Sequence, residues 1–372
     1  MNILVDGRPF VKTAAGISTF LRCSIFEWAN QQPEYNFFVF LPKKIDSSLE
    51  LGELPPNILL LDFHNRLTKH LPNLLLLLLY IPFLIYKYKI DLYYAPVPCI
   101  PFFIPKKTKT LVVVHDVVNL EQSDTMELKN KIANKLFFLR SIRNADFIWT
   151  NSYYTKERVE HYIPKRKCKS IYTGCSVDRN VYKKIEISDE RRLNIKSKYG
   201  ITGKFILFVG SLEPRKNLSF FLGLMPRLFL IYGIQLVVVG GRGWKNSSIK
   251  EIISQSNFPR NSTIFCGYVS NRDLVELYNI ADCFVSASLC EGFGMPQLEA
   301  MLCGCPVVTA HNTAMIEVAQ NKTGVKSVKG YNPKEWIDSI LDVINKNEIP
   351  KLAEFSEYYW PTIIHKLHEY MD

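Results

Sequence analysis

The feature that most constrains the fold is a regular alternation of short apolar segments with longer helix-like ones. The apolar segments of the first half are rich in β-branched and aromatic residues, which favours strands. Helix-like stretches, such as residues 16–31 and 126–145, lie between them. Near-continuous apolar strands separated by helices predict a parallel sheet with both faces covered. The strands predicted for this half are residues 2–6, 36–42, 57–63, 91–96, 110–116, 145–152 and 169–174.

A second series of the same kind follows a break in composition. Residues 176–200 are charged and poor in aliphatic side chains, which predicts a linker and an exposed helix. We therefore predict an α/β protein with two Rossmann-like domains in tandem, and a ligand site in the cleft where they face each other. The predicted ranges are 1–180, 181–350 and an aromatic helical tail, 351–372, that packs back on the domains. Strands are predicted over 204–211, 234–241, 261–269, 282–288 and 306–310, and helices over 217–233, 271–281 and 296–304.

The composition disfavours several classes of protein. The 372 residues are 47% apolar and 22% charged, which is typical of folded chains and sufficient for two cores. Nine irregularly spaced cysteines predict reduced thiols in a cytoplasmic protein, and the N-terminus lacks the pattern of a signal peptide. The net charge of +11 fits diphosphate ligands or an anionic membrane surface, and no nucleic-acid-binding motif accompanies it.

One apolar run bears on membrane contact. The run from Leu74 to Ile85 is shorter than the about 18–20 residues that span a bilayer, and Pro82 interrupts it. Residues 71–90 therefore predict no transmembrane helix. Two interpretations stay open: a helix buried in the first domain, or a helix at the membrane interface with lysines at its flanks.

A strand, a loop and a helix over residues 206–222 predict an anion site. The strand ends at Gly210, and Arg215 and Lys216 stand just before the helix. Backbone N–H groups and the dipole at a helix N-terminus attract anions, and the two cations add to this attraction. Arginine can chelate phosphate oxygens while lysine acts as a point charge. We expect phosphate binding here; the alternative is a solvated basic loop.

A glycine cluster follows another predicted strand, at Gly240, Gly241 and Gly243. It lacks the full G-x-G-x-x-G pattern of a dinucleotide-binding turn, because Lys245 and Asn246 follow. The favoured interpretation is a tight turn close to the ligand.

The strand-to-helix loop LCEGFGM, residues 289–295, is the strongest candidate for ligand contacts. Gly292 and Gly294 let the backbone approach a ligand and present N–H groups at a helix N-terminus. Glu299, on the following helix, can accept two ribose hydroxyls, and Glu291 lies nearer the reacting end. The alternative is that Glu299 compensates the helix dipole while Glu291 faces solvent.

Two residues of the first domain are candidates for the other side of the ligand. Gly16 opens a helix, where it could bring N–H groups to a phosphate or only cap the helix. His115 ends a buried strand, where it would face the cleft and contact a sugar. A purely structural histidine is the alternative.

These motifs resemble those of a known family. FVGSLEPRKN, the segment from FCGYV to PVVTA that contains EGFGMPQLEAM, and VHDVV are similar to retaining glycosyltransferases of the GT-B fold. The most similar group is family four, which includes bacterial mannosyl- and rhamnosyltransferases. The resemblance covers nearly the whole chain, and the E-x7-E spacing of Glu291 and Glu299 is its most specific part. It implies two Rossmann-like domains facing across a cleft, the first binding the acceptor and the second the nucleotide-sugar.

The resemblance also implies a role for each matching residue. Arg215 and Lys216 would neutralise the donor diphosphate, Glu299 would bind the ribose, and Glu291 and His115 would be the catalytic residues at the sugar. Tyr268 and Val269 would contact the base. The other implied donor-binding residues are Gly16, Ser152, Gly210, Gly292, Phe293, Gly294 and Met295.

The function implied is transfer of a hexose, with retention, from a nucleotide-sugar to a glycan or lipid-linked glycan in O-antigen or capsule synthesis. GDP-mannose is the expected donor, and rhamnosyl or glucosyl transfer from dTDP- or UDP-sugars is the alternative. No D-x-D motif ends a strand, so we expect no metal and no cofactor. We expect a cytoplasmic protein, with peripheral contact to anionic lipid at the inner membrane face and no nucleic-acid partner.

Two other classes of protein could share this tandem α/β organisation. An NAD-dependent oxidoreductase would need a full glycine fingerprint, which the chain lacks. A non-catalytic sugar-nucleotide-binding subunit stays open.

Overall fold

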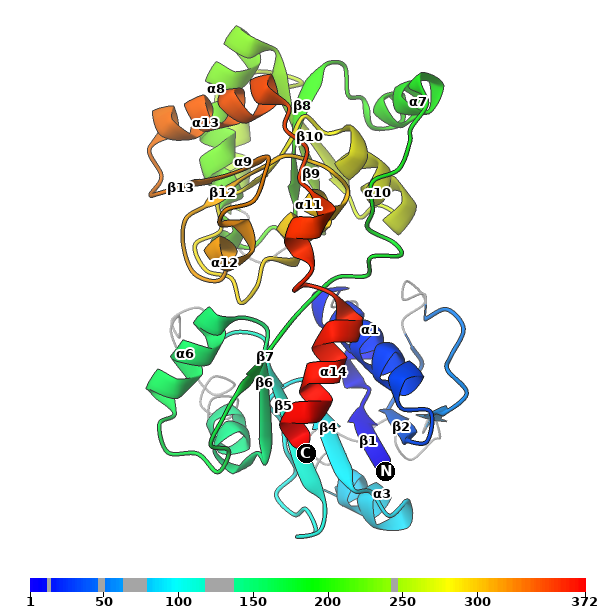
Figure 1. The fold of residues 1–372 in the computed structure, drawn as a ribbon. Coiled ribbons are helices and arrows are strands. Elements are labelled where there is room, and N and C mark those ends of the chain that lie inside the picture. The colour runs from blue at the N-terminus through cyan, green and yellow to red at the C-terminus, as the bar shows by residue number, and fades with distance from the viewer. Residues whose placement is uncertain (12–14, 46–50, 63–78, 118–136, 242–246) are drawn as a thin grey trace. The chain divides into compact units, whose positions relative to one another are not determined.

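A computed structural model describes residues 1–11, 15–45, 51–62, 79–117, 137–241 and 247–372 (Figure 1). The chain divides into two compact units. Unit 1 consists of residues 1–177 and 357–372, and unit 2 of residues 178–356. The C-terminal tail thus begins within unit 2 and ends as part of unit 1.

Unit 1 is built on a parallel sheet with the strand order β3-β2-β1-β4-β5-β6-β7. Every strand predicted for the first half is present. Its central strands are buried almost throughout, which explains their largely apolar sequences. The strands are β1 (Asn2–Asp6), β2 (Asn36–Leu41), β3 (Ile58–Asp62), β4 (Leu92–Ala95), β5 (Lys109–Val114), β6 (Phe147–Thr150) and β7 (Tyr172–Thr173).

The C-terminal helix of unit 1 packs against its first helix (Figure 1). The rings of Phe20 and Trp360 lie 5.3 Å apart, and the side-chain amide of Gln31 donates to the carbonyl of Pro361 at 2.9 Å. Of the helix predicted over 126–145, residues 137–144 are helical and 126–136 lie outside the described residues. The named helices of unit 1 are η1 (Arg8–Val11), α1 (Ala15–Gln31), α3 (Ile81–Lys87), α6 (Tyr153–Tyr162) and α14 (Trp360–Met371).

Unit 2 is built on a second parallel sheet, in the order β10-β9-β8-β11-β12-β13. The edge strand β13 (Val325–Val328) was not predicted, because its sequence VKSV has too few apolar residues to resemble a buried strand. The other strands are β8 (Lys204–Val209), β9 (Ile234–Val239), β10 (Thr263–Gly267), β11 (Cys283–Ser286) and β12 (Val307–Ala310). The helices are α7 (Asp189–Tyr199), η4 (Pro214–Lys216), α8 (Leu218–Tyr232), α9 (Ser247–Ile253), α10 (Asn271–Ile280), α11 (Met295–Leu302), α12 (Met315–Ala319), α13 (Pro333–Lys346) and η5 (Leu352–Phe355).

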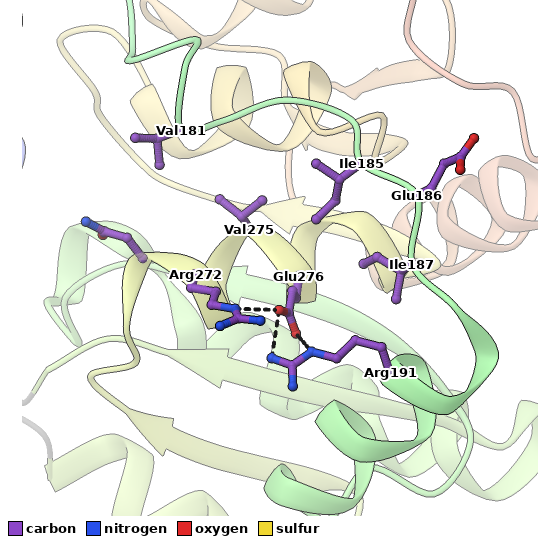
Figure 2. Close-up of a pocket in the computed structure, with 9 residues that line it drawn as sticks. Val181, Ile185, Glu186, Ile187, Arg191, Arg272, Val275 and Glu276 are labelled. Atoms are coloured by element: carbon purple, nitrogen blue, oxygen red, sulfur yellow. Dashed lines mark hydrogen bonds and ion pairs between the residues drawn. The ribbon is translucent and has the colours of Figure 1, made fainter.

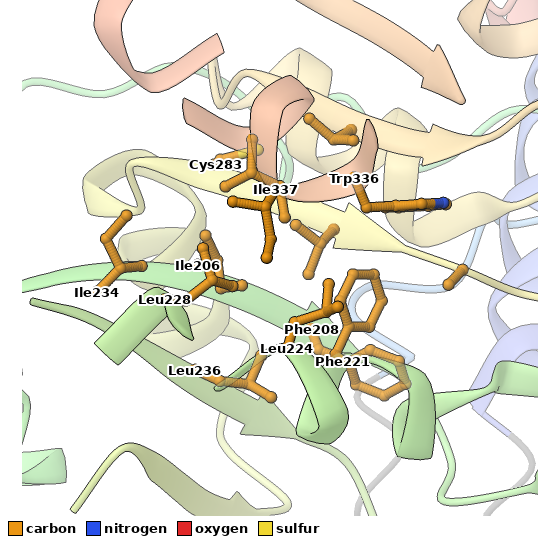
Figure 3. Packing of buried hydrophobic residues seen from close by; sticks show 14 of the residues in the cluster. Ile206, Phe208, Phe221, Leu224, Leu228, Ile234, Leu236, Cys283, Trp336 and Ile337 are labelled. Carbon is orange, nitrogen blue, oxygen red and sulfur yellow. The ribbon is translucent and has the colours of Figure 1, made fainter. Parts of the chain in front are cut away.

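Helices α8 and α13 cover one face of this sheet and form its core with it (Figure 3). Phe221 from α8 and Trp336 from α13 meet edge to face, with ring centroids 5.4 Å apart. Trp336 is fully buried, and its indole N–H donates to the carbonyl of Gly330 at 2.9 Å. This packing holds the sheet rigid beneath the loops that follow its strands.

In each sheet, the strand order reverses at one place. The reversal lies between β1 and β4 in unit 1, and between β8 and β11 in unit 2. The loops that leave the carboxyl ends of two such strands diverge to opposite faces of the sheet, which leaves a crevice for a ligand. The fold alone therefore draws attention to the loops after β8 and β11, which contain the motifs of residues 210–216 and 289–295.

No helix among the described residues is long and apolar enough to cross a membrane. Of the segment 71–90, residues 71–78 lie outside the described residues, and α3 occupies most of the remainder. Helix α3 buries Ile81, Leu84 and Ile85 but leaves Phe83 and Tyr86 51% and 82% exposed. One face of α3 is therefore buried in unit 1, as the first interpretation predicts, while the other face exposes apolar side chains to solvent.

Candidate active site

The two predicted phosphate-binding cations lie on the short helix η4, directly after β8. Asn217 follows in a left-handed conformation, with φ of 53°, and turns the chain into α8. The backbone N–H of Leu289, after β11, donates to the carbonyl of Arg215 at 2.7 Å. The loops on the two sides of the strand-order reversal are thus tied together.

Both cations are in ion pairs with acidic side chains. Glu291 lies 2.5 Å from the Lys216 ammonium through Oε1 and 2.9 Å from Nη1 of Arg215 through Oε2. The Glu213 carboxylate accepts hydrogen bonds from Nε of Arg215 at 2.8 Å and from the Ser211 hydroxyl at 2.9 Å. The cluster therefore pairs two positive with two negative groups. The sequence analysis assigned the two cations and Glu291 to one ligand. It did not predict that they form ion pairs with one another, or that Glu213 pairs with Arg215.

Glu291 is held in the ionised form. Its side chain is buried, which by itself would raise its pKa, but the charges of Lys216 and Arg215 outweigh burial and lower the pKa below its usual range. Its backbone N–H donates to the Thr313 hydroxyl at 3.3 Å, so the loop after β12 also supports it. The alternative in which Glu291 faces solvent is wrong.

The loop of residues 289–295 is held in place by hydrogen bonds of the buried Gln297 on α11. Gly294 has φ of 90° and is the N-cap of α11, which explains why glycine stands there. Gln297 donates from its backbone N–H to the Gly294 carbonyl at 3.1 Å. The Gln297 side chain donates to the carbonyl of Met315 and accepts from the Thr309 hydroxyl, at 2.8 and 2.9 Å. Phe293 is buried, whereas Gly292 and Met295 are partly exposed.

Glu299 lies on α11 in a different environment from Glu291. It is buried, and the hydroxyl of Tyr278 on α10 donates to its Oε2 at 2.9 Å. Burial raises the pKa of Glu299 to about 7, although the hydroxyls of Tyr278 and Tyr182 and the charge of Lys216 act in the opposite direction. The two glutamates of the E-x7-E pattern thus have pKa values shifted in opposite directions, with Lys216 acting on both.

The glycines after β9 serve close packing. A Cβ atom on Gly240 would lie 2.0 Å from the carbonyl oxygen of Gly210, and one on Gly241 would lie 2.2 Å from the ring of Tyr268. Gly243 lies outside the described residues. Tyr268 itself is 69% exposed, and Val269 is half-buried. The tight-turn interpretation fits Gly240 and Gly241, and base contact by Tyr268 and Val269 stays a prediction.

In unit 1, both ring nitrogens of His115 have hydrogen-bond partners. Nε2 lies 2.8 Å from the carbonyl oxygen of Pro96, so it carries the proton, and Nδ1 accepts from the side-chain amide of Asn151 at 2.9 Å. Burial lowers the pKa of His115 to about 4, against the effect of these two hydrogen bonds. The imidazole is therefore neutral near pH 7 with both nitrogens engaged, and its contact with a donor sugar stays a prediction.

The other two candidates of unit 1 lie at helix N-termini. The Ser152 hydroxyl accepts from the backbone N–H of Thr155 at 3.1 Å and caps α6, and Ser152 is buried. Gly16 is the second residue of α1 and exposed, and a Cβ there would meet no atom within 4 Å. Space therefore does not require a glycine at position 16.

Four residues of these sites were missed by sequence reasoning. Glu213 pairs with Arg215, Asn151 fixes the His115 ring, and Tyr182 and Tyr278 bind Glu299. A signal existed for Tyr278, since a tyrosine on the apolar face of an amphipathic helix needs a partner for its hydroxyl.

A separate cavity of about 370 Å³ lies between the segment 181–187 and α10 (Figure 2). Glu276 on its wall binds Arg191 at 2.8 Å and Arg272 at 3.3 Å. None of the residues that line it is a predicted donor-binding residue. The Arg191–Glu276 ion pair links α7 to α10, whereas the Arg272–Glu276 pair lies within α10, and we interpret both as structural.

Across the described ranges, no three His, Cys, Asp or Glu side chains gather as metal ligands would. The expectation that no metal is used stays a prediction. All nine cysteines lie within these ranges, and none is paired in a disulfide.

Comparison with known proteins defines the class of protein. Residues 191–359 match the family model of glycosyl transferases group 1. Over the whole chain, the fold is similar to that of Anabaena Alr3699/HepE, solved in complex with UDP-glucose, with a TM-score of 0.72, 16% identity and coverage of 100% of this chain and 99% of that one. The predicted GT-B fold class is confirmed, and the segment 191–359, just under half of the chain, matches the glycosyltransferase family that the sequence resembles.

Two curated relatives are mannosyltransferases of Escherichia coli. The serotype-specific mannosyltransferase WbdA is 29% identical over 277 residues, which cover 69% of this chain and 32% of WbdA. O-antigen chain mannosyltransferase B is 28% identical over 241 residues, which cover 62% of this chain and 60% of that protein. The match thus spans about a third of the first relative and under two thirds of the second.

Proposed function

We propose that this protein is a retaining hexosyltransferase that moves mannose from GDP-mannose to a glycan or lipid-linked glycan acceptor of a cell-surface polysaccharide. The observation that carries the proposal is the convergence of Arg215, Lys216 and Glu291 within 2.9 Å at the strand-order reversal of unit 2, with Glu299 on the adjoining helix. The mannosyltransferase relatives support mannose as the sugar and O-antigen or capsule synthesis as the setting.

In the proposed reaction, the donor diphosphate replaces Glu291 as the ion-pair partner of Arg215 and Lys216. The cations and the N–H groups of the Gly292–Gly294 loop then stabilise the negative charge of the leaving diphosphate. Glu291, released from its ion pairs, accepts hydroxyls of the donor sugar and stabilises its oxocarbenium-like state. We propose attack from the front face, with the leaving phosphate accepting the acceptor proton, and no part for a metal or cofactor.

The remaining donor contacts follow the same assignment. Glu299 binds the ribose, Tyr268 and Val269 contact the base, and Gly210 and Met295 line the phosphate and sugar regions. His115, as a neutral ring, contacts the donor sugar, and Gly16 and Ser152 approach the donor from the helix N-termini of unit 1.

The donor is identified by thermal shift, since a ligand that binds the folded state raises the unfolding temperature. GDP-mannose is expected to raise it most, by several degrees at saturation, and dTDP-rhamnose and UDP-glucose are the alternatives. The complex of HepE with UDP-glucose makes the last a necessary comparison. Transfer with the best donor should persist in EDTA and give a product of retained anomeric configuration by NMR. Stabilisation by none of these donors contradicts the proposal.

A non-catalytic donor-binding subunit is the second candidate, because a site that binds a nucleotide-sugar need not transfer it. Transfer by the wild type separates the two, because a non-catalytic subunit would bind the donor without turnover. In the enzyme, Glu291→Ala should lose transfer, whereas unchanged turnover would remove Glu291 from catalysis.

We propose that unit 1 contacts the membrane through α3. Besides Phe83 and Tyr86, the preceding Leu79 is 69% exposed, and the exposed Lys87 and Lys89 follow, as in helices that lie at lipid interfaces. The protein should then bind to vesicles that contain anionic lipid at low salt, acting peripherally at the cytoplasmic membrane face.

Vesicle sedimentation of Phe83→Ser/Tyr86→Ser tests this, with Leu230→Ser/Ile231→Ser on α8 as the matched control, since those side chains are 70% and 63% exposed. The α3 pair should weaken binding about tenfold while the α8 pair leaves it unchanged. Equal binding of the wild type and the α3 variant contradicts membrane contact through α3.

A further inference from the structure

Glu299 is not an isolated carboxylate but the centre of a small hydrogen-bonded group. Tyr278 comes from α10, lies fully buried and donates to Oε2 at 2.9 Å. Tyr182 comes from the segment that opens unit 2 and is the second hydroxyl bonded to Glu299. The two tyrosine rings meet edge to face, 6.2 Å apart. Each hydroxyl therefore occupies one place at the carboxylate and leaves others for a ligand.

Tyr182 is fixed because its segment is anchored to α10. The backbone N–H of Ile185 donates to the side-chain oxygen of Asn279 at 2.8 Å, and the Asn279 amide donates to the carbonyl of Lys183 at 3.2 Å. Val181 and Ile185 of the same segment line the cavity of Figure 2. The segment thus delivers one hydroxyl to Glu299 at a fixed place on α10, next to Tyr278.

We propose that Tyr278 and Tyr182 are positioning residues that orient the Glu299 carboxylate, so that it can accept the two ribose hydroxyls of the donor. The inference rests on the proposed function, because it assumes that Glu299 binds ribose. It adds to that function a determinant of the choice between ribonucleotide and deoxynucleotide donors. A protonated carboxyl or one turned away would bind the ribose less well, since a carboxylate accepts hydrogen bonds more strongly than a carboxylic acid.

The charged and titratable groups facing Glu299 support this assignment. Burial favours its protonated form, and Cys303, the C-cap residue of α11, lies near it. Lys216 of η4 and the hydroxyls of Tyr278 and Tyr182 favour the ionised form. The balance leaves the pKa at about 7, so removal of one hydroxyl moves it upward. Donor affinity should therefore rise with pH through neutrality, and each variant should shift this rise to higher pH.

The test compares donor binding by Tyr278→Phe and Tyr182→Phe, which remove only the hydroxyls. Calorimetric titration uses GDP-mannose and its 2′,3′-dideoxy analogue from pH 6 to pH 8.5, because neither has a phosphate that titrates in this range. The wild type should bind GDP-mannose more weakly at pH 6 than at pH 8 by about tenfold, and the dideoxy analogue equally at both. If Tyr278→Phe moves the midpoint by about one pH unit, the ionised fraction at pH 7 falls about fivefold, and affinity for GDP-mannose alone falls with it.

Tyr199→Phe is the matched control. The Tyr199 hydroxyl donates to Oδ2 of Asp273 on the same helix α10 at 2.7 Å, so its loss removes another tyrosine–carboxylate bond of unit 2. It should change neither the affinity nor its pH midpoint.

Three results would overturn the inference: equal weakening of the ribose and dideoxy donors by both Phe variants, an unmoved pH midpoint in both, or the same change in Tyr199→Phe. Two Phe variants at separate chain positions keep the test decisive if one of them folds poorly. Failure of the proposed function would give different results. The wild type would not bind GDP-mannose, or Glu299→Gln would still bind GDP-mannose more tightly than the dideoxy analogue, by the same factor as the wild type.

Discussion

Replacing Lys216 by alanine is expected to lower kcat for transfer by about 10²–10³-fold, the loss typical when one group that stabilises a developing anion is removed. Its ammonium lies 2.5 Å from Glu291, and its charge lowers the pKa of both Glu291 and Glu299. Lys216→Ala therefore removes a diphosphate contact and also makes both glutamates easier to protonate. The pH at which activity rises should move upward with the loss in kcat.

The measurement does not depend on knowing the acceptor. Release of GDP from GDP-mannose by water reports cleavage of the same bond, and transfer to a glycan acceptor is assayed in parallel. Lys204→Ala is the control, because Lys204 is an exposed lysine at the opposite, amino-terminal end of β8. It should retain wild-type rates. Turnover by Lys216→Ala within threefold of the wild type would remove the cation from the mechanism.

Most of the fold could be predicted because its strands are buried on both faces. A strand such as β9, with all six residues buried, has an apolar sequence that only Gln235 interrupts. β13 was missed for the opposite reason, since Lys326 and Ser327 occupy its middle and only one of its four residues is buried. The helix predicted over 126–145 ends at residue 144, close to its predicted end, and its predicted start lies outside the described residues.

The candidate site was predictable as a set of loops but not as a set of contacts. The parallel topology brings the ends of β8 and β11 together, so Arg215 and Glu291, far apart in sequence, could be assigned to one ligand. Their direct ion pair depends on side-chain reach across the strand-order reversal, which sequence patterns do not encode. The bond from Tyr278 to Glu299 joins two helices, and its existence depends on how α10 and α11 pack. The assigned roles of these residues stay predictions.

Gly240→Ala is expected to destabilise unit 2 by about 3–5 kcal/mol, among the larger effects of single substitutions. An added Cβ would lie 2.0 Å from the carbonyl oxygen and 2.7 Å from the carbonyl carbon of Gly210, and both are backbone atoms. The φ of Gly240 is +142°, which an L-residue with a side chain rarely adopts. Since the Gly210 N–H donates to the Val239 carbonyl at 2.9 Å, the two strand ends cannot separate without losing this bond.

The unfolding temperature of Gly240→Ala should therefore be about 10 °C lower than that of the wild type, because a loss of 1 kcal/mol lowers it by about 2–4 °C in a unit of this size. Gly223→Ala is the matched control, because Gly223 is exposed within α8 and a Cβ there would meet no atom within 4 Å. That substitution should stabilise the helix by about 1 kcal/mol. Gly210 leads directly into the segment that holds Arg215, so Gly240→Ala should also weaken donor binding below its melting temperature. If Gly240→Ala unfolds within 2 °C of the wild type, the backbones of Gly210 and Gly240 do not approach each other as closely as these distances indicate.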